Sequence, residues 1–174
     1  MTDCCAGGPV RVLVELDYLV VGGETCDRCG DTRDGVRAAV ADARAALPTV
    51  EIELVERELD PTRLADSNRV LVNGHPAEEW LGGTSVISEC PSCSELIDSF
   101  ACCREIEVGG VRTEAVGRDV VFDAIMAAAG FAPVGVPGEA CCSAAPSASG
   151  CCGSVPDAGA APLTVTLVTA PGCG

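Results

Sequence analysis

The sequence predicts a mixed α/β (α+β) fold, in which a small mixed sheet carries flanking helices. Two strand patterns, at residues 10–21 and 50–59, lie on either side of a segment with helical periodicity. A short third strand, a two-strand hairpin and a closing helix follow along the chain. Strand and helix segments interleaved in this order pack as helices against a sheet, which defines the class.

The first two elements are a strand and a long helix. Residues 10–21 alternate between apolar positions and a mixture of polar and apolar ones, which predicts a mostly buried strand. A helix is predicted over residues 32–47 because apolar residues recur on one of its faces. Thr32 is placed to cap the start of this helix, and Pro48 ends it.

Two further strands are predicted from the alternation of apolar residues. In residues 50–59, Ile52 and Leu54 lie on one face and acidic residues on the other. Residues 69–72 form a shorter strand, which the turn Asn73-Gly74 closes. These strands add to the sheet that the first strand begins.

The remaining elements lie beyond a linker that contains a short helix at residues 94–99. Residues 105–108 and 111–115 predict a hairpin that turns at Gly109-Gly110. Residues 118–129 predict the closing helix, since apolar side chains again recur on one face.

One folded domain is expected over residues 10–131, after a flexible arm at 1–9. From 132 to 162 the composition shifts to Ala, Gly, Ser and Pro without periodicity, which predicts a disordered, cysteine-containing tail. Residues 163–174 hold a strand pattern followed by Ala170-Pro171-Gly172-Cys173, and this segment resembles the start of a glutaredoxin-like domain. It is either the start of a truncated second module or a chance likeness.

Charge and cysteine content narrow the function classes. The net charge of -15 would repel a phosphate backbone, so nucleic-acid binding is not expected. Thirteen Cys against a single His, His75, favour sulfur chemistry over His-based metal sites or Ser-His-Asp catalysis. The N-terminus does not read as a secretory signal, and no apolar run of about 18 residues predicts a membrane span. We therefore expect a cytoplasmic protein whose thiols are kept reduced.

The motif Cys26-Asp27-Arg28-Cys29 follows a buried strand and precedes a helix. The amides and dipole of a helix N-terminus stabilise a thiolate, and the two-residue spacer lets both sulfurs meet one partner. That partner is either the other sulfur, in a disulfide, or a soft metal. Asp27 and the negative net charge oppose thiolate formation, while Arg28 and Arg33 favour it.

A second pair, Cys90-Pro91-Ser92-Cys93, lies in the linker and is followed by Cys102-Cys103. Two C-x-x-C pairs can make a four-thiolate zinc site. The gap between these two pairs is, however, far longer than the roughly 15–20 residues of a zinc ribbon. A relay, in which one pair reduces or unloads the other, is equally open.

Adjacent cysteines recur along the chain. The four such pairs are Cys4-Cys5, Cys102-Cys103, Cys141-Cys142 and Cys151-Cys152. A disulfide between neighbours closes a strained ring, so structural bridging explains them poorly. Neighbouring thiolates instead suit soft, thiophilic centres such as arsenite, mercuric ion or cuprous ion. The three pairs outside the predicted domain are expected to act as accessory capture arms.

Four features of the chain together resemble a known family: the strand-C-x-x-C-helix opening, the strand at 69–74, the Cys90-x-x-Cys93 insert, and the closing hairpin and helix. They are similar to those of an uncharacterised bacterial thioredoxin-like family, a domain of unknown function. The resemblance covers about residues 10–131. It implies a relationship to thiol–disulfide exchange proteins and an association with heavy-metal resistance. Thioredoxin-like proteins usually place a cis-proline before the third strand, facing the active cysteines. Here Asp66-Ser67-Asn68 stands in that place, which argues against ordinary docking of a substrate disulfide.

Three functions follow as hypotheses. The first is binding or transfer of a soft heavy metal or metalloid in detoxification, without an organic cofactor, by a core set of thiols: Cys26, Cys29, Cys90, Cys93, Cys102 and Cys103. The second is an enzyme, a thiol–disulfide oxidoreductase in which Cys26 is the nucleophile and Cys29 resolves the mixed disulfide. Such an enzyme would be served by a thiol reductant or a redox partner protein. A variant of this hypothesis is a reductase or lyase that acts on metals or organometals. The third is a zinc-stabilised interaction module.

Overall fold

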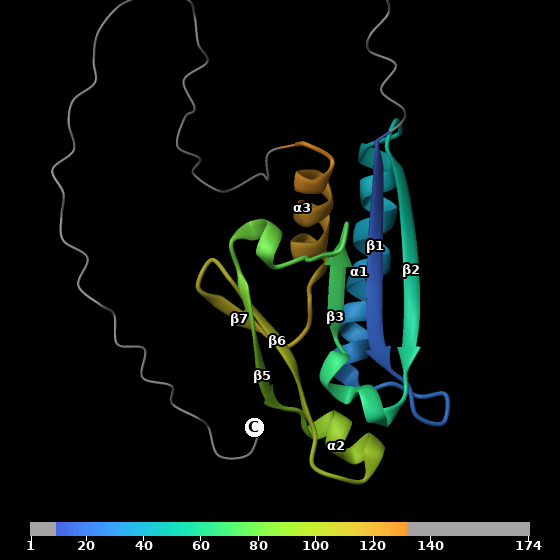
Figure 1. The fold of residues 1–174 in the computed structure, drawn as a ribbon, viewed down its shortest axis with the longest axis vertical. Helices are drawn as coiled ribbons and strands as arrows, with labels where there is room; N and C mark the ends of the chain where they lie inside the picture. The colour runs from blue at the N-terminus through green and yellow to red at the C-terminus, as the bar shows by residue number, and fades with distance from the viewer. Residues whose placement is uncertain (1–9, 132–174) are drawn as a thin grey trace, which may run out of the picture.

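The fold consists of two small sheets with helices packed against them (Figure 1). The computed structural model describes residues 10–131. The elements in chain order are β1 (Arg11–Leu19), α1 (Asp27–Ala46), β2 (Glu51–Leu59), β3 (Arg69–Val72), β4 (His75–Pro76), β5 (Thr84–Glu89), α2 (Pro91–Ile97), β6 (Cys102–Val108), β7 (Val111–Thr113) and α3 (Arg118–Ala128). Two short 3-10 helices, Pro61–Asp66 and Glu79–Leu81, connect strands. The predicted α/β class with flanking helices is confirmed.

The first sheet has the strand order β2-β1-β3-β4. β1 and β2 are parallel, and this pairing requires a crossover connection, which α1 provides. β3 runs antiparallel to β1, with Val72 opposite Val14. The turn predicted at Asn73-Gly74 is confirmed, since both residues adopt positive φ angles of 51° and 80°. The two-residue strand β4 after this turn was not predicted.

The core lies between the first sheet and the helices α1 and α3, which contact each other (Figure 1). The alternation predicted for the first strand is confirmed, because Val12, Val14 and Leu16 are at most 1% exposed. Each side chain of this size contributes about 1.5–3 kcal/mol when fully buried. In residues 10–131, no helix has both the length and the apolar composition needed to cross a membrane.

The second sheet is antiparallel, with the order β5-β6-β7. The predicted hairpin over 105–115 corresponds to β6 and β7, although it belongs to this second sheet instead of extending the first. β6 also begins earlier than predicted, at Cys102, and β5 was not predicted at all. The segment Thr84–Glu89 mixes Ser and Thr with only two apolar residues, so its alternation is weak. α2 lies at one end of this sheet, between β5 and β6 in the chain (Figure 1).

α1 begins five residues before the predicted start, so the first C-x-x-C motif is part of the helix. Its N-cap is Cys26, whose sulfur accepts a hydrogen bond from the backbone N–H of Cys29. The prediction that Thr32 caps this helix is therefore wrong. Thr32 is instead fully buried, and its hydroxyl donates to Asn68 and accepts from the backbone N–H of Val116. The helix starts early because a sulfur replaces the usual oxygen cap.

Candidate metal centre

Five cysteines converge where the starts of α1, α2 and β6 meet. Cys26 caps α1 and Cys29 lies in its first turn. Cys90 is the N-cap of α2 and Cys93 lies in its first turn, while Cys103 comes from β6. All five are free thiols, and none is more than 3% exposed. Two segments far apart in the sequence therefore supply one buried group of sulfurs.

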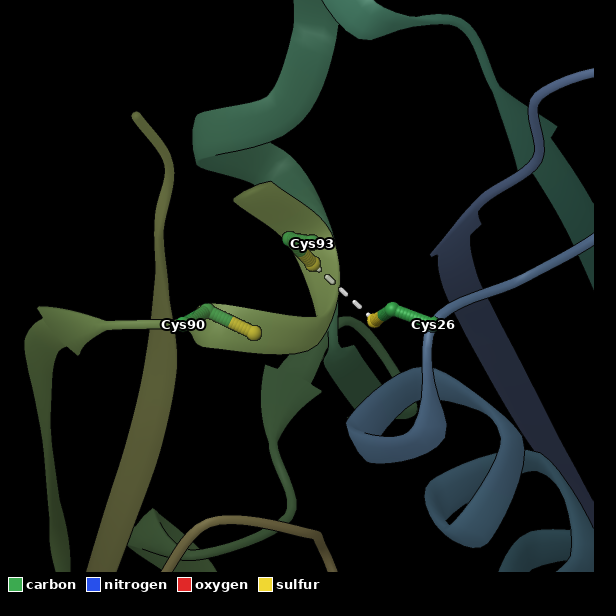
Figure 2. A group of neighbouring side chains, drawn as sticks. All are labelled: Cys26, Cys90 and Cys93. Carbon is green, nitrogen blue, oxygen red and sulfur yellow. Dashed lines mark hydrogen bonds between the residues drawn. The ribbon is translucent and has the colours of Figure 1, made fainter. Parts of the chain in front are cut away.

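The sulfurs lie close enough to share an ion. The Sγ atoms of Cys26, Cys90 and Cys93 are all within 4.8 Å of one another, and Figure 2 shows these three side chains converging from α1 and α2. The Sγ of Cys93 lies 3.0 Å from that of Cys26 and 3.0 Å from that of Cys103. Zinc–sulfur bonds of about 2.3 Å in a tetrahedron place neighbouring sulfurs about 3.8 Å apart. Small side-chain adjustments bring the observed separations to that value.

Cys26 is the thiol best placed to carry negative charge. Hydrogen bonds from the side chains of Cys103, Cys29 and Cys93 lower its pKa well below the ordinary value of a thiol, although burial opposes this shift. The backbone N–H of Cys29 contributes as well, with its nitrogen 3.4 Å from the Cys26 sulfur. The positive end of the α1 dipole favours an anion at the same place. The first charge of the cluster therefore lies at the helix start.

The surrounding thiols hold their protons more tightly. The hydrogen bond to Cys26 raises the pKa of Cys29 to about 11. Hydrogen bonding to Cys103, then to Cys26, raises the pKa of Cys93, and the hydrogen bond to Cys26 raises that of Cys103. These neutral thiols donate to the Cys26 sulfur. A thiophilic ion that enters the cluster must displace their protons, as metal binding to thiols generally does.

Arg28, inside the first C-x-x-C motif, does not act as predicted. Its buried guanidinium donates to the Ser88 hydroxyl at 3.1 Å and pairs with Glu105 at 3.7 Å and Glu114 at 3.4 Å. It therefore joins α1 to the second sheet, and its charge is matched by carboxylates. Arg33, also expected to favour the thiolate, lies over the ring of Tyr18 instead. Sequence reasoning missed the joining role because the carboxylates are far away in the chain.

The segment before β3 brings a polar side chain to the cluster. The hydroxyl of Ser67 lies 3.8 Å from the Cys103 sulfur. The next residue, Asn68, has a φ of 59°, and its amide donates to the carbonyls of Arg104 and Glu114. Asn is among the few residues other than Gly that tolerate this conformation. A buried serine of the segment before β3, Ser67, therefore contacts the thiols.

The predicted metal ligands separate into three groups. Cys26, Cys90 and Cys93 form the closest triad, and Cys29 and Cys103 lie against it. Cys102 is half-buried at the start of β6 and is disulfide-bonded, so it adds no thiol to the cluster. The predicted capture arms lie outside the described residues, as does the strand pattern at 163–174: Cys4, Cys5, Cys141, Cys142, Cys151 and Cys152.

The fold and the buried sulfurs define a mixed α/β protein with a cysteine cluster that can hold a metal ion. Residues 12–125 match a family described as a domain of unknown function (DUF2703), and the chain belongs to this family. It is 32% identical over 118 residues to an uncharacterised protein of Archaeoglobus fulgidus, a stretch that covers 64% of this chain and 83% of the archaeal protein. No solved structure matches the chain.

Proposed function

We propose that the protein binds a soft metal or metalloid ion through the thiolates of Cys26, Cys90 and Cys93. The observation that carries this proposal is the convergence of three buried sulfurs within 4.8 Å, although Cys26 and Cys93 are 67 residues apart in the chain. Thiolate ligands without nitrogen or oxygen partners select soft ions such as cuprous ion, and zinc among the borderline ones. Arsenite and mercuric ion belong to the same thiophilic class.

Burial supports binding over exchange. Thiol–disulfide exchange requires direct attack by a sulfur on the disulfide of a partner, so the attacking sulfur must be reachable. Cys26 is only 3% exposed, and Cys93 of α2 lies directly against it (Figure 2). A small ion can enter such a site after a local opening, whereas a protein disulfide cannot. Closed sulfur sites of this kind retain their ion.

A thiol–disulfide oxidoreductase is the second candidate. The strand-motif-helix opening and the cap position of Cys26 support it, because a helix N-terminus activates a thiolate. The β-α-β unit followed by an antiparallel strand also supports the thioredoxin-like relationship that the sequence suggests. In this function Cys26 would attack and Cys29 would resolve the mixed disulfide. The burial of both sulfurs is the observation against it.

The test compares both activities on one preparation of the reduced full chain. Cuprous ion, arsenite, mercuric ion and zinc are titrated in turn, and bound ions are counted by native mass spectrometry. We expect a soft ion to remain bound and to raise the thermal midpoint, since a ligand of the native state stabilises it by mass action. Reduction of insulin and of glutathione disulfide is measured in parallel.

Single substitutions to Ser at Cys26, Cys90 and Cys93 identify the ligands. Each is expected to weaken binding strongly, while Cys29→Ser, a matched change at an equally buried thiol outside the triad, keeps the ion. Zinc binding that is tighter than binding of every soft ion would favour the zinc-stabilised module. Robust disulfide reduction that disappears in Cys26→Ser, together with weak metal binding, would replace the proposed function by the oxidoreductase.

A further inference from the structure

The cluster contains more sulfurs than one three-coordinate ion uses. Besides the triad of Cys26, Cys90 and Cys93, a fourth sulfur, that of Cys103, contacts Cys93. The Sγ of Cys93 lies 3.0 Å from that of Cys26 and 3.0 Å from that of Cys103. Cys26 and Cys93 therefore belong to the triad and also lie next to the fourth sulfur, in a second group made of Cys26, Cys93 and Cys103.

We propose that the cluster binds two cuprous ions, with Cys26 and Cys93 as bridging thiolates and with Cys90 and Cys103 as terminal ligands, one for each ion. This inference rests on the proposed function and narrows it to a soft univalent ion. Thiolate sulfur is the soft ligand that selects cuprous ion, and it can bridge two of these ions. As the two ions bind, each ligand sulfur that still carries a proton releases it to solvent.

A second ion adds no uncompensated charge to the buried site. A univalent ion held by three thiolates leaves two negative charges uncompensated. Two such ions that share four thiolates leave the same two negative charges. Although burying unpaired charge is unfavourable, the site therefore accepts the second ion without a further electrostatic cost. Arg28, the buried cation of the same motif, does not compensate the thiolates because Glu105 and Glu114 pair with it.

The hydroxyl groups around the cluster match this assignment. Cys90 has the Ser92 hydroxyl 3.6 Å from its sulfur, and Cys103 has the Ser67 hydroxyl at 3.8 Å. A terminal thiolate keeps more negative charge than one shared by two ions, and hydrogen bonds to charged groups are the stronger ones. Each proposed terminal ligand therefore has a hydroxyl donor at hand. Cys93, a proposed bridging ligand, contacts the sulfurs of Cys26 and Cys103 instead.

The test uses the full chain in a background where the cysteines outside the cluster are serine: Cys4, Cys5, Cys102, Cys141, Cys142, Cys151, Cys152 and Cys173. Cuprous ion is supplied anaerobically as its acetonitrile complex. Native mass spectrometry counts the bound ions, and X-ray absorption detects copper–copper scattering. We expect two ions for each chain, with copper–copper scattering. In Cys103→Ser we expect one ion and no such scattering.

Cys29→Ser is the matched control, because Cys29 is equally buried and contacts the cluster but is not a proposed ligand. It is expected to keep both ions. One ion in the background chain, or two ions in Cys103→Ser, would overturn the inference and leave the proposed function standing. If Cys29→Ser loses the second ion, the assignment of the ligands is overturned. If no cuprous ion binds at all, this inference fails, and the proposed function fails with it only if arsenite and mercuric ion do not bind either. If the background chain does not fold, which non-cooperative unfolding would show, Cys103→Ser and Cys29→Ser are compared in the native sequence instead. There Cys103→Ser must bind one ion fewer than Cys29→Ser.

Discussion

The guanidinium of Arg28 lies 3.7 Å from the carboxylate of Glu105, and this pair joins the helix that carries Cys26 to the sheet that carries Cys103. The same guanidinium donates to the Ser88 hydroxyl, which in turn hydrogen-bonds to Glu105. The contacts connect α1 to both β5 and β6. The sulfurs therefore meet because a buried ion pair holds their two supporting elements together.

Substituting Arg28→Met in the metal-free protein is expected to lower the free energy of unfolding by about 3 kcal/mol, because the buried Glu105 then keeps only the Ser88 hydroxyl and an ion pair with Arg112 at 4.0 Å. Chemical denaturation measures this change. The control is Arg33→Met, which removes a contact with the Tyr18 ring and an exposed ion pair with Asp34 at 3.8 Å, and it is expected to change stability by about 1 kcal/mol or less. Equal effects of the two substitutions would contradict the joining role of Arg28.

Asp17 gives the fold a defined dependence on pH. It is 1% exposed, and although burial alone would raise its pKa, hydrogen bonds from Arg57 and Arg69 hold the pKa below the ordinary 3.8. Between the lowered pKa of Asp17 in the folded state and the ordinary pKa of 3.8 in the unfolded state, the unfolded state binds more protons. The free energy of unfolding therefore rises with pH in this range. The contribution of Asp17 is fully present above pH 3.8 and is lost as the pH falls through its folded-state pKa.

The matched substitution is Asp17→Asn, which keeps the size of the side chain. Near neutral pH we expect it to lower the free energy of unfolding by about 3–5 kcal/mol. The difference between the two proteins should shrink as the pH falls below the folded-state pKa of Asp17. Denaturation curves recorded over this range test the prediction, and a difference that stays constant with pH would contradict it.

Two glycines are expected to respond to alanine in opposite directions. A Cβ at Gly83 would lie 2.5 Å from the carbonyl oxygen of Glu107 and 3.0 Å from that of Glu78, so Gly83→Ala should destabilise the protein by about 1–3 kcal/mol or more. A Cβ at Gly30, inside α1, meets only a methyl group of Thr25 at 3.7 Å. Gly30→Ala should therefore stabilise the helix by roughly 0.5–1 kcal/mol. Thermal unfolding of both variants tests this prediction, and a shift of the thermal midpoint in the same direction for both would contradict it.

Cys26 is predicted to be the most reactive of the five clustered thiols in the metal-free protein. Its lowered pKa keeps it ionised near neutral pH, where Cys29, Cys93 and Cys103 are protonated because their pKa values are raised. Iodoacetamide labelling, mapped by mass spectrometry, should modify it first. Its labelling rate should change little between neutral and alkaline pH, while that of Cys29 rises. Equal rates for the two thiols at neutral pH would remove the basis for a nucleophilic role.

Much of the fold can be predicted from hydrophobic periodicity. β1, β2 and α3 have strong patterns over many residues, and the structure places them close to the predicted bounds. β5 was missed because its Ser and Thr residues weaken the alternation that marks a strand. The start of α1 was misplaced because the cap is a sulfur of Cys26, and Cys is not among the preferred capping residues.

The cysteine-rich character of the site can be predicted from composition, but its arrangement cannot. Spacing alone suggests that Cys102 and Cys103 act together, yet neighbouring residues in a strand point to opposite faces. Only Cys103 reaches the cluster. The contact of Cys93 with Cys26 depends on how the second sheet folds back against α1, and that depends on long-range contacts such as those of Arg28 and Asn68.

The cap of α1 makes one backbone amide sensitive to whether the cluster holds an ion. The amide N–H of Cys29 donates to the same Cys26 sulfur that is proposed to bind the ion. When that sulfur shares its electrons with a metal, it becomes a weaker acceptor, and the magnetic environment of this one amide proton changes. NMR spectra of the nitrogen-labelled chain should therefore show loading at the backbone of Cys29, without any dye, chelator or modified residue.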